Sequence, residues 1–249
     1  MKLLLINPNS VDAMTKAMEV AARATPVSDA LQIDVYTAPS LAPQSINNGE
    51  HIADSSKHVL DDMVDNASVD VQKYDALLVA CYSVHILVPQ LASRFPHATV
   101  TGIFEASILT ALSLIAGVDS SECWGIVTTG KFWEKHLTDG VGAFLGYEGR
   151  DKRFCGVYST GLTASDLHSL TPEAIRAKVK SATLKLLAAG NVACVAMGCG
   201  AMAGLEDVIR DAAREAYGRE RGDGLYIIDG VKAGVIQLHQ MVNCKKVFR

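Results

Sequence analysis

Short apolar runs alternate along the chain with segments whose apolar residues recur every three or four positions. Leu3 to Ile6 is an unbroken apolar run, and Met14, Met18 and Ala21 follow it at helical spacing. Continuous runs of this length predict buried strands, whereas the longer period predicts helices with one apolar face. Strands that alternate with helices are typical of a parallel sheet covered by helices, so the pattern predicts an α/β fold.

The pattern continues to residue 242, with polar or proline-rich segments between the elements. Residues 38–49 are expected to form a loop, and residues 214–223 a charged surface turn. Ser10 is expected to cap the first helix, and Thr171 with Pro172 to begin the helix that Gly190 ends. The expected strands cover residues 3–6, 31–36, 76–80, 99–103, 124–128, 154–158, 192–197 and 225–228, and the expected helices end near residues 21, 64, 94, 116, 190, 216 and 242.

The two halves of the chain are similar in the residues that end their strands. The first strands end in Ile6-Asn7-Pro8-Asn9-Ser10 and Ile126-Val127-Thr128-Thr129-Gly130, and the third strands end in Ala80-Cys81-Tyr82-Ser83 and Gly198-Cys199-Gly200-Ala201. This repetition predicts an internal duplication, with two similar α/β halves on either side of one cleft. We expect residues 1–102 with 230–249 to form the first domain and residues 103–229 the second.

Composition and charge narrow the class of protein. The 249 residues are 49% hydrophobic and 20% charged, which suffices for a full core and excludes disordered and fibrous classes. A net charge of −4 without long charge runs argues against nucleic acid or an anionic membrane as the main partner. No stretch approaches the roughly 20 apolar residues that span a bilayer, and no signal-peptide pattern is present. We therefore expect a cytoplasmic protein that acts on a small molecule and keeps its six cysteines reduced.

Cys81 and Cys199 occupy equivalent places after the third strand of each half, and each precedes an expected helix start. Ligands of open α/β sheets bind at the carboxyl ends of strands, and a helix amino terminus favours the thiolate form of cysteine. Most free cysteines are small buried residues, and this alternative stays open for either one taken alone. Their equivalence favours a functional role for both. No direct role is expected for the other four, Cys123, Cys155, Cys194 and Cys244.

Short polar side chains and backbone N–H groups lie beside these two cysteines and at the ends of the first strands. They suit a small ligand rich in carboxylate or imide oxygens, although ordinary turn and capping chemistry explains any one of them equally well. Ser45 and Ile46, on the proline-bounded loop, are expected to form a wall over the site. The candidate substrate-binding residues are Asn9, Ser45, Ile46, Tyr82, Ser83, Thr128, Thr129, Gly200 and Ala201, with Asn7 beside them.

Two further titratable residues follow strand ends. His85 lies four residues after Cys81, one turn along the expected helix, where it either acts as the base of a Cys–His pair or is a local polar residue. Glu105 either reaches the cleft or interacts with the dipole of the helix that begins there. No C-x-x-C pair, histidine cluster or G-x-G-x-x-G fingerprint is present, so no metal and no cofactor are expected.

At this level of detail the sequence resembles the Asp/Glu/hydantoin racemase superfamily, most closely its hydantoin and allantoin racemase branch. The matching segments run in family order along essentially the whole chain. Ser83-Val84-His85 stands where that branch often has a Gly-Asp-Pro type run, and Gly200 stands where it often has alanine. The segments that carry the resemblance are Ile6-Asn7-Pro8-Asn9-Ser10, Pro43-Gln44-Ser45-Ile46, Ala80-Cys81-Tyr82-Ser83, Gly125-Ile126-Val127-Thr128-Thr129, Gly198-Cys199-Gly200-Ala201-Met202 and Ile228-Asp229-Gly230-Val231.

The resemblance implies two α/β domains related by pseudo-twofold symmetry, with the last helix returning to the first domain. It also implies cofactor-independent racemisation by two cysteines, Cys81 and Cys199. A 5-substituted hydantoin such as allantoin is the expected substrate, because the proton at C5 is a weak carbon acid beside a carbonyl group. One base removes that proton, and an acid on the opposite face returns one.

Two alternatives stay open on sequence grounds. The first is an enzyme on a small dicarboxylate: an aspartate or glutamate racemase, or an isomerase or decarboxylase with one essential thiol. The second is a non-catalytic two-domain binding protein, which needs neither cysteine. Helices over residues 106–116 and 231–242 are apolar on more than one face, which also predicts a homo-oligomer.

Overall fold

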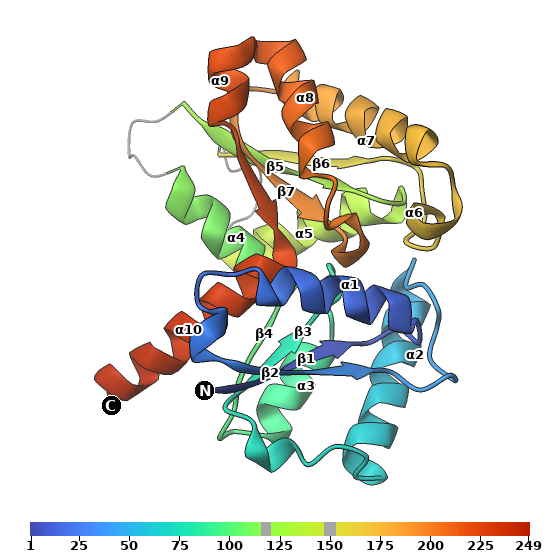
Figure 1. Cartoon of the computed structure of the whole chain (residues 1–249), viewed down its shortest axis with the longest axis vertical. Coiled ribbons are helices and arrows are strands. Elements are labelled where there is room, and N and C mark those ends of the chain that lie inside the picture. Colours follow the sequence, from blue (N-terminus) through green and yellow to red (C-terminus); the bar gives the residue numbers. More distant parts are fainter. Residues whose placement is uncertain (116–120, 147–152) are drawn as a thin grey trace. The chain divides into compact units, whose positions relative to one another are not determined.

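The chain forms two α/β units, each built on its own parallel four-stranded sheet (Figure 1). Unit 1 contains Met1–Ala106 and Gly230–Arg249, and unit 2 contains Ser107–Asp229. The computed structural model describes residues 1–115, 121–146 and 153–249. Helix α4 (Ile103–Leu114) begins in unit 1 and continues into unit 2, so the chain passes between the units twice.

The sheet of unit 1 has the strand order β2-β1-β3-β4. Every side chain from Leu3 to Ile6 is buried, as expected for a central parallel strand with both faces covered by helices. The last helix, α10, packs on β3 and β4, and its Gly234 approaches β3 so closely that a Cβ atom there would lie 2.5 Å from Leu78 Cδ1. The elements are β1 (Lys2–Asn7), α1 (Asp12–Arg23), β2 (Gln32–Thr37), α2 (Gly49–Leu60), β3 (Ala76–Val79), α3 (Leu87–Arg94), β4 (Thr99–Gly102) and α10 (Gly230–Val247).

The sheet of unit 2 has the order β6-β5-β7-β8. Trp124 on β5 is fully buried, and its ring packs against Phe154 of the neighbouring β6 with centroids 4.6 Å apart. Thr171 Oγ1 accepts the N–H of Ala174, which confirms the cap predicted from Thr171 and Pro172. The elements are β5 (Cys123–Thr128), α5 (Phe132–Leu145), β6 (Phe154–Ser159), α6 (Asp166–Ser169), α7 (Pro172–Leu187), β7 (Val192–Gly198), α8 (Glu206–Tyr217), α9 (Arg219–Gly224) and β8 (Tyr226–Asp229).

The two sheets share one topology, with β1 to β4 corresponding to β5 to β8 in turn. At the carboxyl end of β1, Asn7 pairs with Thr37, and the Asn7 carbonyl accepts from the N–H of Ala38 at 3.0 Å. In unit 2, Thr128 pairs with Ser159 and accepts from the N–H of Thr160 at 2.8 Å. Asn7 and Thr128 are therefore equivalent residues, and the predicted α/β class with two similar halves is confirmed.

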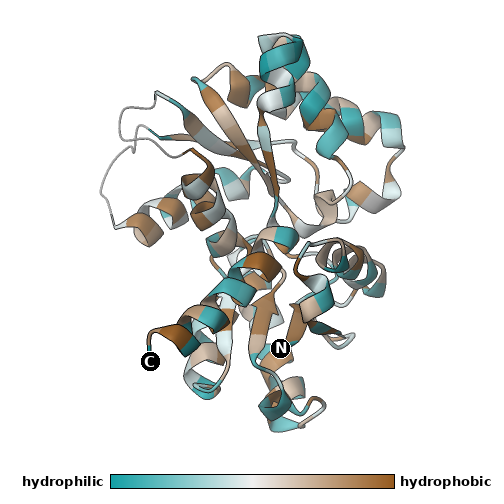
Figure 2. Cartoon of the chain, turned by 60° about the vertical axis from the view of Figure 1, so that its left-hand side comes forward, coloured by the Kyte–Doolittle hydropathy of each residue, from teal (hydrophilic) through white to brown (hydrophobic). Residues whose placement is uncertain are grey.

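Apolar residues gather in the strands and on the helix faces that cover them. Leu4, Leu77 and Phe95 belong to the core of unit 1, and Val127 and Leu186 to the core of unit 2. Figure 2 shows the result, with brown concentrated in the strands and teal on the outer helices. Burial of such side chains contributes about 1.5–3 kcal/mol each and is the main source of stability in each unit.

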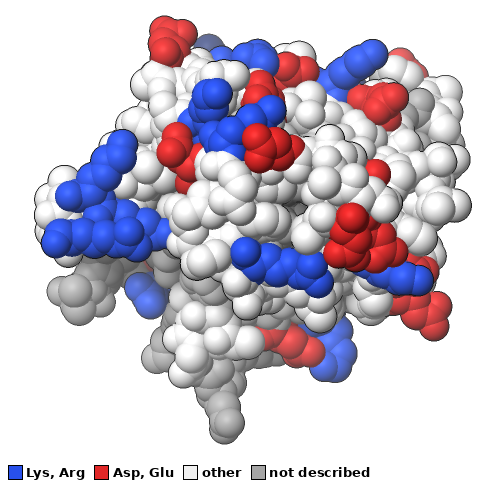
Figure 3. Space-filling view, turned by 90° about the horizontal axis from the view of Figure 1, so that it is seen from below, with Lys and Arg blue, Asp and Glu red and all other residues white. Residues whose placement is uncertain are grey.

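Most charged side chains lie on the surface, and many pair locally. Arg176 and Asp207 join α7 to α8 with a contact of 2.8 Å. Acidic and basic groups both occur on the face in Figure 3, with uncharged surface between them. Exposed pairs contribute only about 0–1 kcal/mol each, so the helices are held mainly by apolar packing. None of the described helices is long and apolar enough to cross a membrane.

The structure corrects several expected elements. Ser10 does not cap α1: Val11 holds the cap position, and the Ser10 hydroxyl donates to the carbonyl of Ala42 at 2.9 Å. The segment expected to be a charged turn contains helix α9, and α5 was not predicted although Trp133 and Leu137 form an apolar stripe. Helix α4 begins three residues earlier than expected, and its expected end at residue 116 lies outside the described residues.

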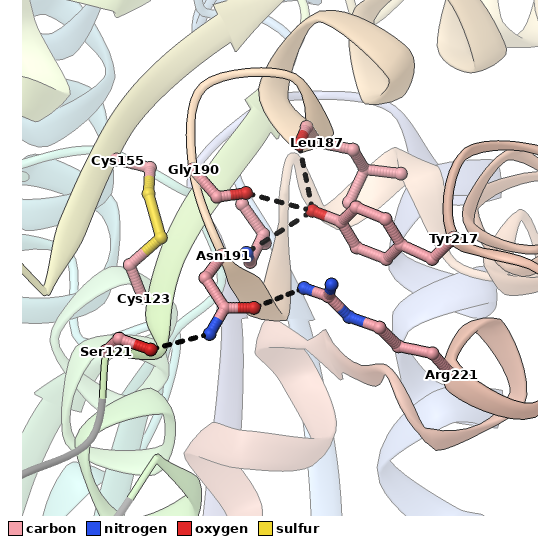
Figure 4. Close-up of a disulfide and its surroundings, with 9 residues drawn as sticks. Ser121, Cys123, Cys155, Leu187, Gly190, Asn191, Tyr217 and Arg221 are labelled. Carbon is pink, nitrogen blue, oxygen red and sulfur yellow. Dashed lines mark hydrogen bonds between the residues drawn. A yellow bond between two sulfur atoms is a disulfide. The ribbon is translucent and has the colours of Figure 1, made fainter.

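The expectation that all six cysteines are reduced is wrong for Cys123 and Cys155, which form a disulfide (Figure 4). They are 32 residues apart, and their apolar sequence surroundings do not reveal that β5 and β6 begin side by side. Gly190 fits against the bond, because a Cβ atom there would lie 3.0 Å from Cys155 Sγ and 3.1 Å from Cys123 Sγ. The Tyr217 hydroxyl donates to the Leu187 carbonyl at 2.8 Å, next to the segment that joins α7 to β7 and contains Gly190. Because Cys123 and Cys155 lie at the starts of β5 and β6, the disulfide lies at the amino-terminal end of the sheet.

Candidate active site

The carboxyl ends of β1 and β3 in unit 1, and of β5 and β7 in unit 2, carry most of the candidate residues. Strand pairing joins Ile6 to Val79 and Thr128 to Gly198. Cys81 and Cys199 each follow these third strands, at equivalent places. Neither is in a disulfide, and both are partly exposed, whereas Cys194 in the middle of β7 is fully buried. The geometry thus separates these two cysteines from Cys194.

Cys81 lies in a loop that folds back on itself. The Ser83 hydroxyl donates to Cys81 Sγ at 3.4 Å, and the Ser83 N–H donates to the Cys81 carbonyl at 3.0 Å. Tyr82, between them, is buried, and its ring packs edge-on against Phe104 with centroids 5.6 Å apart. The first atoms of α10 also reach this loop, because a Cβ on Gly230 would lie 3.2 Å from Tyr82 Cδ2. Packing and hydrogen bonds therefore fix the position of the thiol.

Cys199 begins a short 3₁₀ turn over Gly200–Met202. Burial raises the pKa of the Cys199 thiol to about 11, although the N–H of Ala201 lowers it by donating to the sulfur. Gly200 and Ala201 themselves are partly exposed. Near neutral pH the Cys199 side chain is thus a protonated thiol.

Neither cysteine is followed at once by an α-helix, contrary to expectation. α3 begins at Leu87 and α8 at Glu206, six and seven residues after the cysteines. The predicted lowering of thiol pKa by a helix amino terminus is therefore wrong for Cys199, where burial dominates. The sequence pattern identified the strand ends correctly but not the loops that follow them.

The loop after β1 is organised by Asn7, which is fully buried. Its amide donates to Asn9 Oδ1 at 3.0 Å and to Thr15 Oγ1 at 2.9 Å, and its carbonyl oxygen Oδ1 accepts the Asn9 N–H at 3.2 Å. Asn9 Oδ1 also accepts from Val11, whereas Asn9 Nδ2 contacts only the sulfur of Met14, at 3.3 Å, among the described residues. Sulfur is a weak acceptor, so the Asn9 amide retains a donor for a ligand.

The equivalent residue in unit 2, Thr128, is also fully buried, and its hydroxyl donates to the Gly198 carbonyl at 2.7 Å. Thr129 is 3% exposed, and its carbonyl accepts the N–H of Gly161 at 2.9 Å. The Thr128 hydroxyl is therefore bonded to the residue that precedes Cys199 in the chain. It supports the backbone that carries the thiol and is not free to donate to a ligand.

The loop over residues 38–48 is attached to the loop after β1. Ser10 makes both contacts, through its hydroxyl to the Ala42 carbonyl and through its N–H to the Pro43 carbonyl at 3.2 Å. Ser45 is partly exposed and donates to Asn47 Oδ1 at 3.0 Å, and Ile46 is 7% exposed. Ser45 is thus accessible to a ligand, whereas Ile46 is buried.

Both ring nitrogens of His85 have partners in the neighbouring backbone and in α2. It lies in the loop before α3 and is 2% exposed. Its Nδ1 accepts the N–H of Leu87 at 3.3 Å, which leaves the proton on Nε2, and Nε2 lies 3.1 Å from the Ser55 hydroxyl. These contacts agree with the local polar role.

Glu105 has a buried carboxyl group, which the sequence does not predict. It lies in the first turn of α4, and its carboxyl group folds against Gly102, where a Cβ atom would lie 2.4 Å from Oε2. Burial raises the pKa of Glu105 to about 7, although its own N–H and that of Gly102 lower it. Among the described residues no group of three or more His, Cys, Asp or Glu side chains is arranged to hold a metal ion.

Comparisons with known proteins agree with a two-unit α/β enzyme of this kind. The family model for Asp/Glu/hydantoin racemases matches residues 3–238. A Pseudomonas hydantoin racemase is 28% identical over 235 residues, 94% of this chain and 83% of the relative. A Schizosaccharomyces pombe protein is 34% identical over 244 residues, 97% of this chain and 92% of the relative.

The solved allantoin racemase of Pseudomonas fluorescens has the same fold, with a TM-score of 0.77, 22% identity, and coverage of 98% of this chain and 92% of that chain. The family match spans nearly the whole chain. The protein therefore belongs to the Asp/Glu/hydantoin racemase family and is an isomerase, a racemase. The resemblance carried by the strand-end motifs is confirmed.

Proposed function

We propose that this racemase inverts the C5 stereocentre of a 5-substituted hydantoin, such as allantoin, with Cys81 and Cys199 as its two acid/base groups. The observation that carries the proposal is the equivalence of the two residues, each following the third strand of a sheet with the same strand order. Both are partly exposed and neither is in a disulfide. A duplicated fold that presents one thiol from each half fits a reaction that needs one group on each face of a carbon atom.

The chemistry requires no redox step. A thiolate takes the C5 proton, and the electron pair of the broken C–H bond is delocalised onto the neighbouring carbonyl as an enolate. A thiol then gives its proton to the opposite face of C5, which re-forms the C–H bond with inverted configuration. The two sulfur atoms have exchanged protonation states, and the opposite enantiomer reacts with the roles reversed. Positioned acid/base groups of this kind contribute about 10²–10⁴-fold each.

Donors in the strand-end loops support stabilisation of the enolate. The Asn9 amide faces only the weak acceptor sulfur of Met14 among the described residues, and the Ala201 N–H lies at the Cys199 sulfur. Loss of one donor to a developing oxyanion costs about 3–4 kcal/mol in comparable enzymes. We propose that the Asn9 amide binds a ring oxygen, while the Ala201 N–H donates to the Cys199 sulfur. Tyr82, Ser45 and Ile46 are proposed to shape the pocket for the ring substituent.

The charge of the strand-end loops favours an uncharged ring over an amino acid. Residues 7–10, 38–48, 80–86, 160–165 and 198–205 contain no lysine or arginine. Lys131, after β5, is largely exposed and lies 3.5 Å from Glu134. A free amino acid brings a carboxylate, for which a positive side chain is the usual partner. Racemisation of aspartate or glutamate is the second candidate.

A substrate panel tests the proposal. The protein is incubated with single enantiomers of allantoin, of alkyl and aryl hydantoins, and of aspartate and glutamate, and optical rotation is followed. We expect loss of rotation with one or more hydantoins and none with the amino acids. Racemisation of aspartate or glutamate but of no hydantoin would overturn the substrate assignment.

We also propose a homo-oligomer, because α10 exposes Ile236 and, at its end, Val247, followed by Phe248, which is 82% exposed. Light scattering at micromolar concentration tests this. A monomeric mass contradicts it.

A further inference from the structure

Ser83 directs both of its polar groups back at Cys81. Its hydroxyl donates to Cys81 Sγ at 3.4 Å and its N–H donates to the Cys81 carbonyl at 3.0 Å. The side chain of Ser83 is fully buried, so its single O–H is committed to the sulfur rather than exposed to a ligand. A hydroxyl that donates to a sulfur atom binds the negatively charged form more strongly than the neutral one, because hydrogen bonds to ionised groups are stronger.

Unit 2 lacks this hydroxyl. The position equivalent to Ser83, two residues after the cysteine, is Ala201, whose N–H is the donor to Cys199. Burial raises the pKa of the Cys199 thiol to about 11. The duplication therefore places a serine beside one thiol and an alanine beside the other, at otherwise equivalent points of the two sheets.

The titratable groups on the elements around the Cys81 loop have contacts of their own. His85 has Nδ1 bound to the Leu87 N–H and Nε2 next to the Ser55 hydroxyl. Glu105, at the start of α4, folds its carboxyl group against Gly102. Tyr82 packs its ring on Phe104. The Ser83 hydroxyl, by contrast, is directed at the Cys81 sulfur.

We infer that Ser83 is a positioning residue that stabilises the Cys81 thiolate, so that the resting enzyme holds its base on Cys81 and its acid on Cys199. In the resting state the Cys81 thiol has released its proton to solvent, Ser83 donates to the sulfur, and Cys199 keeps its proton. The assignment of base and acid roles rests on the proposed function. The unequal protonation of the two thiols does not depend on that function.

Reciprocal substitutions test the inference in the intact protein. Ser83→Ala gives unit 1 the side chain found in unit 2, Ala201→Ser does the reverse, and Ser83→Thr is the conservative control. Each protein is treated with iodoacetamide from pH 5 to 12, a range that includes the raised pKa of Cys199, about 11. The thiolate displaces iodide, and the modified Cys81 and Cys199 peptides are quantified by mass spectrometry. This readout measures thiolate fraction and requires no substrate.

We expect Ser83→Ala to move the pH midpoint of Cys81 alkylation upward by about one to two units, the equivalent of a hydrogen bond to a charged group. The Cys199 midpoint should stay unchanged, Ser83→Thr should restore the original Cys81 midpoint, and Ala201→Ser should lower the Cys199 midpoint. If the substrate panel detects racemisation, the acid limb of kcat/KM should move with the Cys81 midpoint.

Two results would overturn the inference. An unchanged Cys81 midpoint in Ser83→Ala, with native circular dichroism, leaves Ser83 a structural role only. An equal shift of both cysteines points to general loosening of the fold. Failure of the substrate panel with the Cys81 shift intact would contradict the proposed reaction and leave the asymmetry of the thiols standing.

Discussion

The hydroxyl of Thr128 donates to the carbonyl oxygen of Gly198, 2.7 Å away, and so joins the last residues of β5 and β7. Both residues are buried, and a Cβ atom on Gly198 would lie 2.7 Å from Thr128 Cβ and from Ile126 Cγ2. Gly198 immediately precedes Cys199. This bond therefore fixes the peptide that presents the thiol of unit 2.

Thr128→Val removes that donor with little change in volume. The Gly198 carbonyl then remains buried without its partner, and we expect the free energy of unfolding to fall by about 1–3 kcal/mol. Thr128→Ser keeps the hydroxyl and is expected to lose less. Urea denaturation followed by circular dichroism measures both variants. Equal stability of the valine variant and the wild type would show that this hydrogen bond does not support the strand end.

Reduction of the Cys123–Cys155 disulfide is expected to destabilise unit 2. The bond spans 32 residues, and chain-entropy arguments for a loop of this length give about 3–4 kcal/mol. Urea denaturation with and without dithiothreitol measures the loss. Cys123→Ser should match the reduced wild type in both buffers, and Cys244→Ser, at an exposed position on α10, should behave like the wild type. Indifference of the wild type to dithiothreitol would contradict a structural role for the bond.

Glu105 should make stability depend on pH in the direction opposite to a salt-bridged carboxylate. Burial raises its pKa from the ordinary 4.5 to about 7, so the folded state holds the proton more tightly than the unfolded chain. The free energy of unfolding therefore falls as pH rises from about 4.5 to about 7, by about 3 kcal/mol in total, and then levels off.

Glu105→Gln removes the titrating carboxyl group, and with it this pH dependence, while the side chain keeps nearly the same size and shape. The variant should equal the wild type near pH 4, below the unfolded-state pKa, and exceed it in stability at pH 8. Glu220→Gln, at an exposed position on α9, should leave the pH dependence unchanged. Urea denaturation at both pH values compares the three proteins. Parallel stability curves for Glu105→Gln and the wild type would show that the carboxyl group is not buried as described.

The alternation of apolar runs and helical stripes was enough to predict the α/β class and the duplication, because buried parallel strands such as Leu3 to Ile6 have few other interpretations. The strand ends also followed from sequence, since Cys81 and Cys199 come directly after such runs. The loops did not follow, because their geometry depends on tertiary contacts. Ser10 bonds to Ala42 across the fold rather than capping its own helix.

The disulfide and the role of individual polar groups were likewise hidden. Cys123 and Cys155 meet only because β5 and β6 are neighbours in the sheet. From sequence, Thr128 and Ser83 were both predicted to bind the ligand. The structure shows that both hydroxyls donate to groups of the protein instead. A short polar residue at a strand end marks a site in sequence, but its hydrogen-bond partner decides whether it meets the ligand or supports the residue that does.

Proton exchange in D₂O with Cys81→Ser and Cys199→Ser tests the two-thiol mechanism most directly. Each variant is incubated with each enantiomer of the hydantoin that the panel identifies, and loss of the C5 proton is followed by proton NMR. Both variants should lose racemisation by at least about 10²-fold, because one acid/base group is missing. Each should retain exchange on the one enantiomer whose proton its surviving thiolate reaches, and the two variants should prefer opposite enantiomers. One variant near normal and the other inactive towards both enantiomers would contradict the account and leave a single essential cysteine in its place.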